Sequence, residues 1–350
     1  MGTDQISLET PSRAGRMRIL KIIPYYGTWP IYMHLYLESC RHNPMLEVVF
    51  VTDLEPFPDS PPNVTYHRLS FAGLRSRIAR IFQVDTLRMV PYKLCDFRPA
   101  YGVIFSDLIA GVDFWGYGDN DMILGRVSAF ITPEKLAEYD VLSFKKGHLQ
   151  GPFTLFRNTD RINNLFRDGG AYKRAFSTPE YVSFDEFGPD MFHTKIGSWQ
   201  DLESVASDNI SVIAFKRAKA ADIRVYSEQH GREYLQRDDL LVWRAGRVWN
   251  ARTGQEYLFY HWVLEKRGIW FKYPGWFVNR PDHYYVSRTG FYSRADARAY
   301  AILHTWRLLK GTILWSGLKA ANFVRRRTGR TVTLDTYPKI GWVKDLTRPW

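Results

Sequence analysis

Two aspartates separated by one residue, Asp119 and Asp121, interrupt an apolar and aromatic stretch at 112–123. Side chains alternate along a strand, so residues spaced in this way at a strand end can point in the same direction. Placing two like charges together out of water costs free energy unless an opposite charge compensates them. A divalent cation that prefers oxygen ligands is the simplest compensation, so the spacing predicts a metal site. The same residues are also typical of a polar turn.

The segment one helix upstream of this pair carries groups that suit a phosphorylated ligand. Lys93 and Arg98 are cations that could bind phosphate, and Asp96 lies between them. The sequence leaves two interpretations of Asp96 equal. It orients one of these cations or a sugar hydroxyl, or it caps a helix that begins there with Pro99 in its first turn.

Two motifs farther along the chain add groups for binding an acceptor and for acid–base chemistry. His148 lies between two glycines, ahead of a strand that ends at Arg157 and Asn158, and glycine lets the backbone approach a ligand closely. Asp185 and Glu186 lie between two phenylalanines, where an acid has a raised pKa that suits a general base. For one of these two acids, a surface position is the simpler interpretation.

A histidine and a lysine complete this set of polar residues. His261 ends an apolar strand, and Lys266 follows five residues later. A lone histidine is more often a core residue. Together with a distant aspartate pair it becomes a candidate third metal ligand, and Lys266 could then reach a diphosphate.

The predicted strands and helices bring several of these groups to one edge of a sheet. Apolar and β-branched runs predict strands at 18–24, 46–53, 63–69, 112–118, 139–144 and 154–157, and helical spacing predicts helices at 31–40, 74–84, 96–110 and 161–167. Strands that alternate with helices favour a largely parallel sheet, which binds ligands beyond the carboxyl ends of its strands. The loop Tyr25, Tyr26, Gly27 follows the first strand, and Asp53 ends the second, where an acid commonly accepts a hydrogen bond from a ribose. Turn residues between short apolar runs predict a β-meander at 240–260.

Taken together, these segments resemble a family of bacterial proteins of the GT-A glycosyltransferase fold that is associated with surface-polysaccharide synthesis. The resemblance runs from Arg18 to Lys266 and rests on the collinear segments 23–30, 52–53, 92–102, 114–125, 147–158, 184–186 and 261–266. The late histidine and lysine are also similar to those of glycogenin and the lipopolysaccharide galactosyltransferases. In one departure from many GT-A proteins, Gly118 precedes Asp119 where a larger residue is common, which concerns the shape of this loop.

The resemblance implies an α/β fold of the GT-A type, a Rossmann-like mixed sheet that is flanked by helices and binds a nucleotide sugar. It implies transfer of a sugar from a nucleotide donor, expected to be a UDP-sugar, to a hydroxyl of a saccharide or lipid-linked acceptor. Asp119, Asp121 and His261 would hold Mn²⁺ or Mg²⁺. The donor would contact Tyr25, Tyr26, Gly27, Asp53, Lys93, Asp96, Arg98, Asn120 and Lys266, and the acceptor would contact His148, Arg157 and Asn158. Glu186 or Asp185 would be the general base of an inverting reaction. A retaining reaction requires no such base, and these acids would then bind sugar hydroxyls.

The C-terminal part of the chain carries most of the net charge of +12. Residues 301–350 hold ten lysines and arginines and two acids, which amounts to eight of these twelve charges. Residues 299–324 place aromatic and aliphatic side chains at helical spacing among basic ones. Such a helix suits an anionic membrane surface or packs on the catalytic domain. We therefore expect a disordered leader at 1–16, a GT-A catalytic domain at 17–270 and a basic, aromatic, helical extension at 271–350.

Two other functions share parts of this pattern. A nucleic-acid-binding protein would explain the net charge and the 16% aromatic content, but its basic residues would interleave with aromatics on a sheet face, whereas here they lie in the tail. We therefore do not expect nucleic acid as a partner. A metal-dependent nucleotidyl- or phosphotransferase would share the aspartates and usually adds a glycine-rich phosphate loop. Two cysteines without metal or disulfide spacing, and no apolar run of about 20 residues, favour a cytoplasmic protein. If the C-terminal helix binds an anionic membrane instead of packing on the catalytic domain, the protein would be peripheral at the inner face of the plasma membrane.

Overall fold

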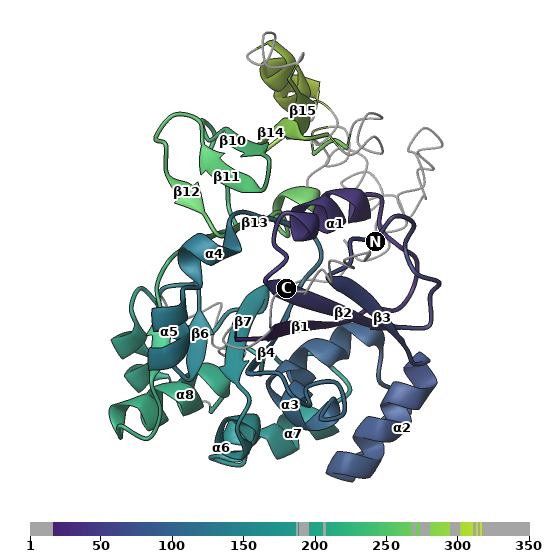
Figure 1. The fold of residues 1–350 in the computed structure, drawn as a ribbon, viewed down its shortest axis with the longest axis vertical. Coiled ribbons are helices and arrows are strands. Elements are labelled where there is room, and N and C mark those ends of the chain that lie inside the picture. The colour runs from purple at the N-terminus through teal and green to yellow at the C-terminus, as the bar shows by residue number, and fades with distance from the viewer. Residues whose placement is uncertain are drawn as a thin grey trace, which may run out of the picture.

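Short apolar strands build a central mixed sheet in the computed structural model of the protein, which describes residues 17–186, 188, 196–205, 208–267, 271–273, 281–294, 302–310, 313 and 316. The sheet has seven strands in the order β3-β2-β1-β4-β7-β6-β8 (Figure 1). Their bounds are β1 Ile19–Pro24, β2 Leu46–Thr52, β3 Val64–Arg68, β4 Phe114–Gly118, β6 Val141–Ser143, β7 Phe153–Arg157 and β8 Val225–Ser227. Strands β3, β2, β1 and β4 are parallel, whereas β7 is antiparallel to both β4 and β6.

The strand order places a topological switch point between β1 and β4. The sheet grows from β1 toward β2 and β3 on one side, and the chain then returns to add β4 on the other side. Open α/β sheets bind ligands at such a point, beyond the carboxyl ends of the strands. Tyr25, Asp53 and Asp119 directly follow β1, β2 and β4, so three of the predicted site residues lie at this edge.

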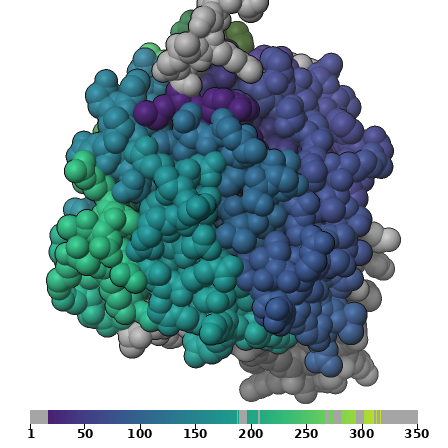
Figure 2. Space-filling model, turned by 60° about the horizontal axis from the view of Figure 1, so that its bottom comes forward, coloured from purple at the N-terminus to yellow at the C-terminus, as the bar shows by residue number. Residues whose placement is uncertain are grey.

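Helices cover both faces of the central sheet because its strands alternate two sets of apolar residues. Leu20 and Ile22 of β1 belong to a core with α2, α3, α6, α7 and α8, whereas Ile19 and Ile23 belong to a core with α1, α4 and α5. In Figure 1, α1 accordingly lies on the opposite side of the sheet from α2 and α3. Figure 2 shows the lower side of the molecule, where the blue segments that contain α2 and α3 border the teal segment that follows them.

The helices differ in length, and several are single turns. Among the described residues between 17 and 267, the α-helices are α1 Met33–Arg41, α2 Phe71–Phe82, α3 Tyr101–Ile104, α4 Val127–Phe130, α5 Pro133–Glu138, α6 Asp160–Asn163, α7 Ala171–Ser177 and α8 Ile210–Lys219. The 3₁₀ helices there are η1 Pro91–Ala100, η2 Leu165–Arg167, η4 Trp199–Ser204 and η5 Glu265–Arg267. The prediction of a long helix that begins at Asp96 is wrong. Asp96 lies inside η1, and only one α-helical turn, α3, follows before the chain becomes irregular. The side chain of Asp96 accepts hydrogen bonds from distant backbone amides instead of capping a helix.

Two smaller sheets complete the described structure. One has the order β5-β13-β9, with β5 Met122–Leu124, β13 Phe259–His261 and β9 Gly231–Arg232. The other has the order β12-β11-β10-β14-β15, with β12 Glu256–Tyr257, β11 Arg247–Asn250, β10 Leu241–Arg244, β14 His283–Ser287 and β15 Gly290–Ser293. The predicted meander is confirmed for its first two strands, and its third is divided between the two sheets. Because β14 pairs with β10, the expected domain boundary at residue 270 falls within one sheet.

The structure describes only part of the two terminal segments for which the sequence predicts a leader and an extension. The expected leader at 1–16 lies outside the described residues. Within the expected extension, residues 302–310 are helical, whereas most of 311–350 lies outside the described part of the chain. Across the described ranges, no helix combines the length and the apolar character needed to span a membrane.

Candidate metal and nucleotide-sugar site

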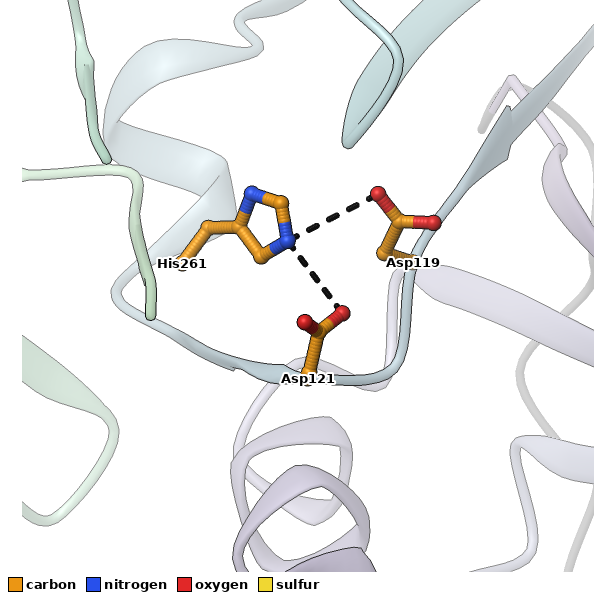
Figure 3. A group of neighbouring side chains, drawn as sticks. All are labelled: Asp119, Asp121 and His261. Atoms are coloured by element: carbon orange, nitrogen blue, oxygen red, sulfur yellow. Dashed lines mark ion pairs between the residues drawn. The ribbon is translucent and has the colours of Figure 1, made fainter. Parts of the chain in front are cut away.

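Strand pairing brings the two predicted aspartates and the predicted histidine together. Asp119 follows β4, and Asp121 precedes β5, so the tight turn between these strands carries both carboxylates. Strand β13 pairs antiparallel with β5 and opposes His261 to Met122, next to Asp121. His261 Nε2 lies 3.2 Å from Asp121 Oδ1 and 3.7 Å from Asp119 Oδ2 (Figure 3). One possible ligand atom from each residue lies within 4.8 Å of the other two.

The electrostatics of this group suit a cation. Burial by itself would raise the pKa of Asp121, but the neighbouring His261 and Lys266 outweigh it and hold this pKa well below its ordinary value. Burial by itself would lower the pKa of His261, but Asp121, Glu233 and Asp119 outweigh it and raise this pKa to about 10. Two carboxylates and one imidazole form a donor set that Mn²⁺ accepts, and the carboxylates alone suit Mg²⁺.

Lys266 and Asn120 take different positions around this group. Lys266 lies in η5, and its ammonium donates to Asp121 Oδ2, so it adds a cation beside the predicted metal site. Asn120 is buried, and its amide contacts Met33 Sδ of α1 at 3.8 Å. The side chain of Asn120 is therefore directed to the helix behind the turn rather than to the two carboxylates.

Arg98 joins Asp119 of the candidate metal site to Asp185, which lies farther along the chain. Its Nη2 donates to Asp119 Oδ1, and its Nη1 donates to Asp185 Oδ2 at 2.9 Å. Because one guanidinium binds both carboxylates, Asp185 lies beside the group of Asp119, Asp121 and His261. Arg98 is nearly buried, and its ring neighbour is Tyr117.

Asp185 and Glu186 occupy different environments although they are adjacent in sequence. Asp185 is fully buried and accepts hydrogen bonds from Arg98 and, at 3.0 Å, from the hydroxyl of Tyr181. Glu186 is less buried, and its Oε1 accepts one hydrogen bond, 2.8 Å long, from the amide of Gly151. Burial, reinforced by the nearby Glu233, raises the pKa of Glu186 above its ordinary value.

Lys93 and Asp96 form an internal ion pair away from the carboxylate group. The Lys93 ammonium donates to Asp96 at 2.8 Å and to the backbone carbonyls of Ala175 and Glu180, each at 2.6 Å. Asp96 in turn accepts hydrogen bonds from two amides, at residues 182 and 184. Both residues thus fasten the chain that leads to the Asp185–Glu186 pair. All three protons of the Lys93 ammonium have acceptors within the chain, so the pair positions this segment instead of facing a ligand.

The loop after β1 presents aromatic groups at the edge of the sheet where the switch point lies. The amide of Tyr25 donates to Val51 of the neighbouring strand, its hydroxyl donates to Thr28, and its ring stacks on Trp29 with centroids 5.2 Å apart. Tyr26 packs on the ring of Phe71. Gly27 has a φ of 124°, which a side chain rarely allows, and this explains the glycine. Asp53 is exposed just after β2.

The three residues predicted to bind an acceptor do not lie together. Arg157 pairs with Phe114 in the β4–β7 ladder, at the end of β4 opposite to Asp119, and its guanidinium bonds Asp140 and three backbone carbonyls. Asn158 follows it and donates to the carbonyls of residues 109 and 112. Only His148 is near the site: it is half-buried, and its electrostatic neighbours are Lys145 and Glu233.

Three residues that the sequence patterns did not single out also belong to this site. Glu233 lies beside His261, and Lys145 pairs with Glu233. Lys21 is fully buried in β1, and its ammonium donates to the backbone carbonyl of Asp119 at 3.1 Å. Burial lowers the pKa of Lys21 to about 8. A lysine inside the apolar run of β1 was a visible signal in the sequence, whereas Glu233 had no comparable local signal.

Comparisons with known proteins give a family and distant likenesses among solved structures. Residues 21–294 match the family described as "Family of unknown function (DUF6625)". No curated protein shows a significant match. Among solved structures, the apo form of mouse xyloside xylosyltransferase 1 is similar with a TM-score of 0.37 and 9% identity, over 71% of this chain and 98% of that chain. At such a distance, the likeness assigns no activity.

Proposed function

Because the chain belongs to this family of unknown function, we propose its activity from the site itself: it is a metal-dependent glycosyltransferase that uses a nucleotide sugar, expected to be a UDP-sugar. The observation that carries the proposal is the group Asp119, Asp121 and His261 at the topological switch point of the sheet. The aromatic loop after β1 lies at the same edge, where a nucleoside would bind. This combination is also what the resemblance of the sequence to GT-A proteins implies.

The polar residues of the site have distinct proposed roles toward the donor. Mn²⁺ or Mg²⁺ held by the carboxylates and the imidazole would neutralise the charge that develops on the departing diphosphate. Lys266 would add a cation there, since its ammonium already lies at Asp121. Tyr25, Tyr26, Gly27 and Asp53 would hold the nucleoside. Arg98 would keep Asp119 oriented.

Glu186 is the proposed general base if the reaction inverts the anomeric centre. Its carboxylate has a single described hydrogen bond, and its raised pKa favours proton uptake. Asp185 instead is held by Arg98 and Tyr181, so it would serve to position Arg98 or to bind a sugar hydroxyl. In a retaining reaction no such base is required, and Glu186 would bind the sugar as well. The anomeric configuration of the product, measured by NMR, distinguishes these roles.

The test of the proposed function is a thermal-shift panel on the full chain. The panel contains UDP-, GDP-, CDP- and dTDP-sugars, nucleoside triphosphates and a short oligonucleotide, each with Mn²⁺, Mg²⁺ or EDTA. We expect a nucleotide sugar, with UDP as its nucleotide, to raise the Tm only when a divalent cation is present. Equal stabilisation by triphosphates without a sugar would favour a nucleotidyl- or phosphotransferase. Stabilisation by the oligonucleotide alone would favour a nucleic-acid-binding protein.

We also propose that the helix at 302–310 brings the enzyme to an anionic membrane that carries a lipid-linked acceptor. Ile302, Trp306, Leu309 and Ile313 recur at helical spacing and are 56–75% exposed, so they form one apolar stripe. Arg307 anchors the helix by donating to two backbone carbonyls, that of Thr289 in the turn between β14 and β15 and that of Phe291 in β15. The ammonium of Lys310 lies 5.0 Å from the ring of Trp306, so a basic group accompanies the stripe.

A flotation experiment tests this membrane contact. The full chain should float with vesicles that contain phosphatidylglycerol, and the double substitution Trp306→Ser, Leu309→Ser should remove at least about 90% of the floating fraction, because it removes the largest apolar area of the stripe. Leu87→Ser is the matched control, since Leu87 is 76% exposed elsewhere on the surface. Equal flotation of the double variant and the wild type would contradict the proposal.

A further inference from the structure

A third carboxylate, that of Glu233, lies behind the histidine of the proposed metal site. Glu233 Oε1 is 3.8 Å from His261 Nδ1, on the side of the ring opposite to Nε2, which faces Asp119 and Asp121. The two nitrogens of this buried imidazole are therefore divided between two kinds of partner. One faces the predicted metal ligands, and the other faces a carboxylate that is too far around the ring to reach a metal bound at Nε2.

The position of Glu233 follows from strand pairing. Strand β9 runs parallel to β13, with Gly231 opposite Phe259 and Arg232 opposite Tyr260. Continuing this register by one residue places Glu233 next to His261. Gly231 makes the close approach possible, because a Cβ there would lie only 2.2 Å from the ring of Phe259. The pairing of these strands thus aligns the carboxylate with the ring.

A second contact fixes the other oxygen of Glu233. The ammonium of Lys145, in the segment between β6 and β7, pairs with Glu233 Oε2. Because Lys145 occupies one oxygen, the carboxylate presents Oε1 to the imidazole. The ion pair with the Lys145 ammonium stabilises the charged form of this carboxyl group.

We propose that Glu233 is a positioning residue that becomes the hydrogen-bond acceptor of His261 Nδ1–H when a metal is bound at Nε2, and thereby directs the Nε2 lone pair to that metal. The inference rests on the metal site of the proposed function. A metal-bound histidine usually donates its second N–H to a carboxylate or carbonyl, which fixes the ring and its tautomer. Lys145 supports the same arrangement from behind.

The test measures binding of Mn²⁺ alone to the full chain, by EPR or calorimetry, without any nucleotide sugar. Glu233→Ala should weaken Mn²⁺ binding by about 10–100-fold, the usual effect of removing a partner of a metal ligand. Glu233→Gln removes the charge but retains an oxygen acceptor, so its affinity should stay within about threefold of the wild type. Glu228→Ala is the matched control, since Glu228 is an exposed acid five residues away in the same segment.

Two further measurements test whether Glu233 acts by orienting the imidazole ring of His261 or in another way. In a His261→Ala background, Glu233→Ala should have no additional effect on Mn²⁺ affinity, because a residue that acts only through His261 loses its effect with it. In the Co²⁺-loaded protein, Glu233→Ala should shift the visible absorption bands, whereas Glu228→Ala should not. An equally large loss in Glu233→Gln, or a full additional loss in the His261→Ala background, would overturn the proposal in favour of a simple charge effect.

The failure of this inference and the failure of the proposed function give different results. If His261→Ala binds Mn²⁺ as the wild type does, the metal site itself is wrong. If His261→Ala loses the metal but Glu233→Ala does not, only the role of Glu233 is wrong. If the alanine variant does not fold, the glutamine variant still decides, because retained affinity in it supports the acceptor role and a large loss contradicts it.

Discussion

Replacing Asp121 by asparagine, or His261 by alanine, should lower Mn²⁺ affinity and metal-dependent release of UDP from a UDP-sugar by at least about 100-fold. The basis is the geometry of the group: both residues offer ligand atoms to one point, and both are buried. Residues that only support a metal ligand already cost about 10–100-fold when they are removed, so loss of a direct ligand should cost more. Equilibrium dialysis with Mn²⁺ and an assay of released UDP measure the two effects.

The control for these variants is Asp160→Asn, an exposed acid in the first turn of α6. It changes the net charge by the same amount as Asp121→Asn and should leave both measurements within about twofold of the wild type. Far-UV circular dichroism should be the same for all variants. Wild-type rates of metal-dependent UDP release in both Asp121→Asn and His261→Ala would refute the assignment of the metal ligands.

Replacing Gly118 by alanine should lower the free energy of unfolding by about 3 kcal/mol or more. The backbone of Gly118 has no unusual φ, but a Cβ there would lie 2.1 Å from the carbonyl oxygen of Pro152 and 2.3 Å from Cε of Lys21. The side chain of Lys21 can move, whereas the carbonyl belongs to the backbone beside β7. Inserting a methyl group into a filled core usually costs about 1–3 kcal/mol, and a contact with backbone lies at the upper end.

Chemical denaturation of Gly118→Ala and of the control Gly197→Ala measures this effect. Gly197 is exposed and has an ordinary φ, and a Cβ there would lie 3.7 Å from its nearest neighbour, so its replacement should change stability by less than about 0.5 kcal/mol. If Gly118→Ala unfolds at the same denaturant concentration as the wild type, Gly118 does not pack closely on the carbonyl of Pro152, and the prediction is wrong. The same packing explains why a glycine precedes Asp119 in this chain.

Much of the central sheet could be predicted because short sequence patterns are enough to identify its strands. The runs that form β1, β2 and β3 are short, apolar and bounded by turn residues, and the structure places strands within a residue or two of the predicted ends. That Asp119 and Asp121 lie close together could be predicted from their spacing at a strand end alone. Adding His261 required the collinear set of motifs, since 140 residues separate it from Asp121 in sequence.

The remaining parts of the site depend on contacts that no local pattern records. Glu233 reaches His261 through the parallel pairing of β9 and β13, and β9 has only two residues. Arg157 ends a strand whose neighbour runs in the opposite direction, so the motif that contains it extends away from the metal group. Asp96 has the composition of a helix cap, but the distant amides of 182 and 184 compete successfully for its carboxylate.

The three candidate metal ligands lie at the ends of strands from two different sheets. Asp119 directly follows β4 of the central sheet. Asp121 directly precedes β5 of the three-stranded sheet, and His261 is the last residue of β13 in that same sheet. An ion held by all three would therefore act as a cross-link between the sheets and would add its binding free energy to the stability of their packing. Metal concentration would then set how firmly the two sheets are held together as well as whether the site is complete.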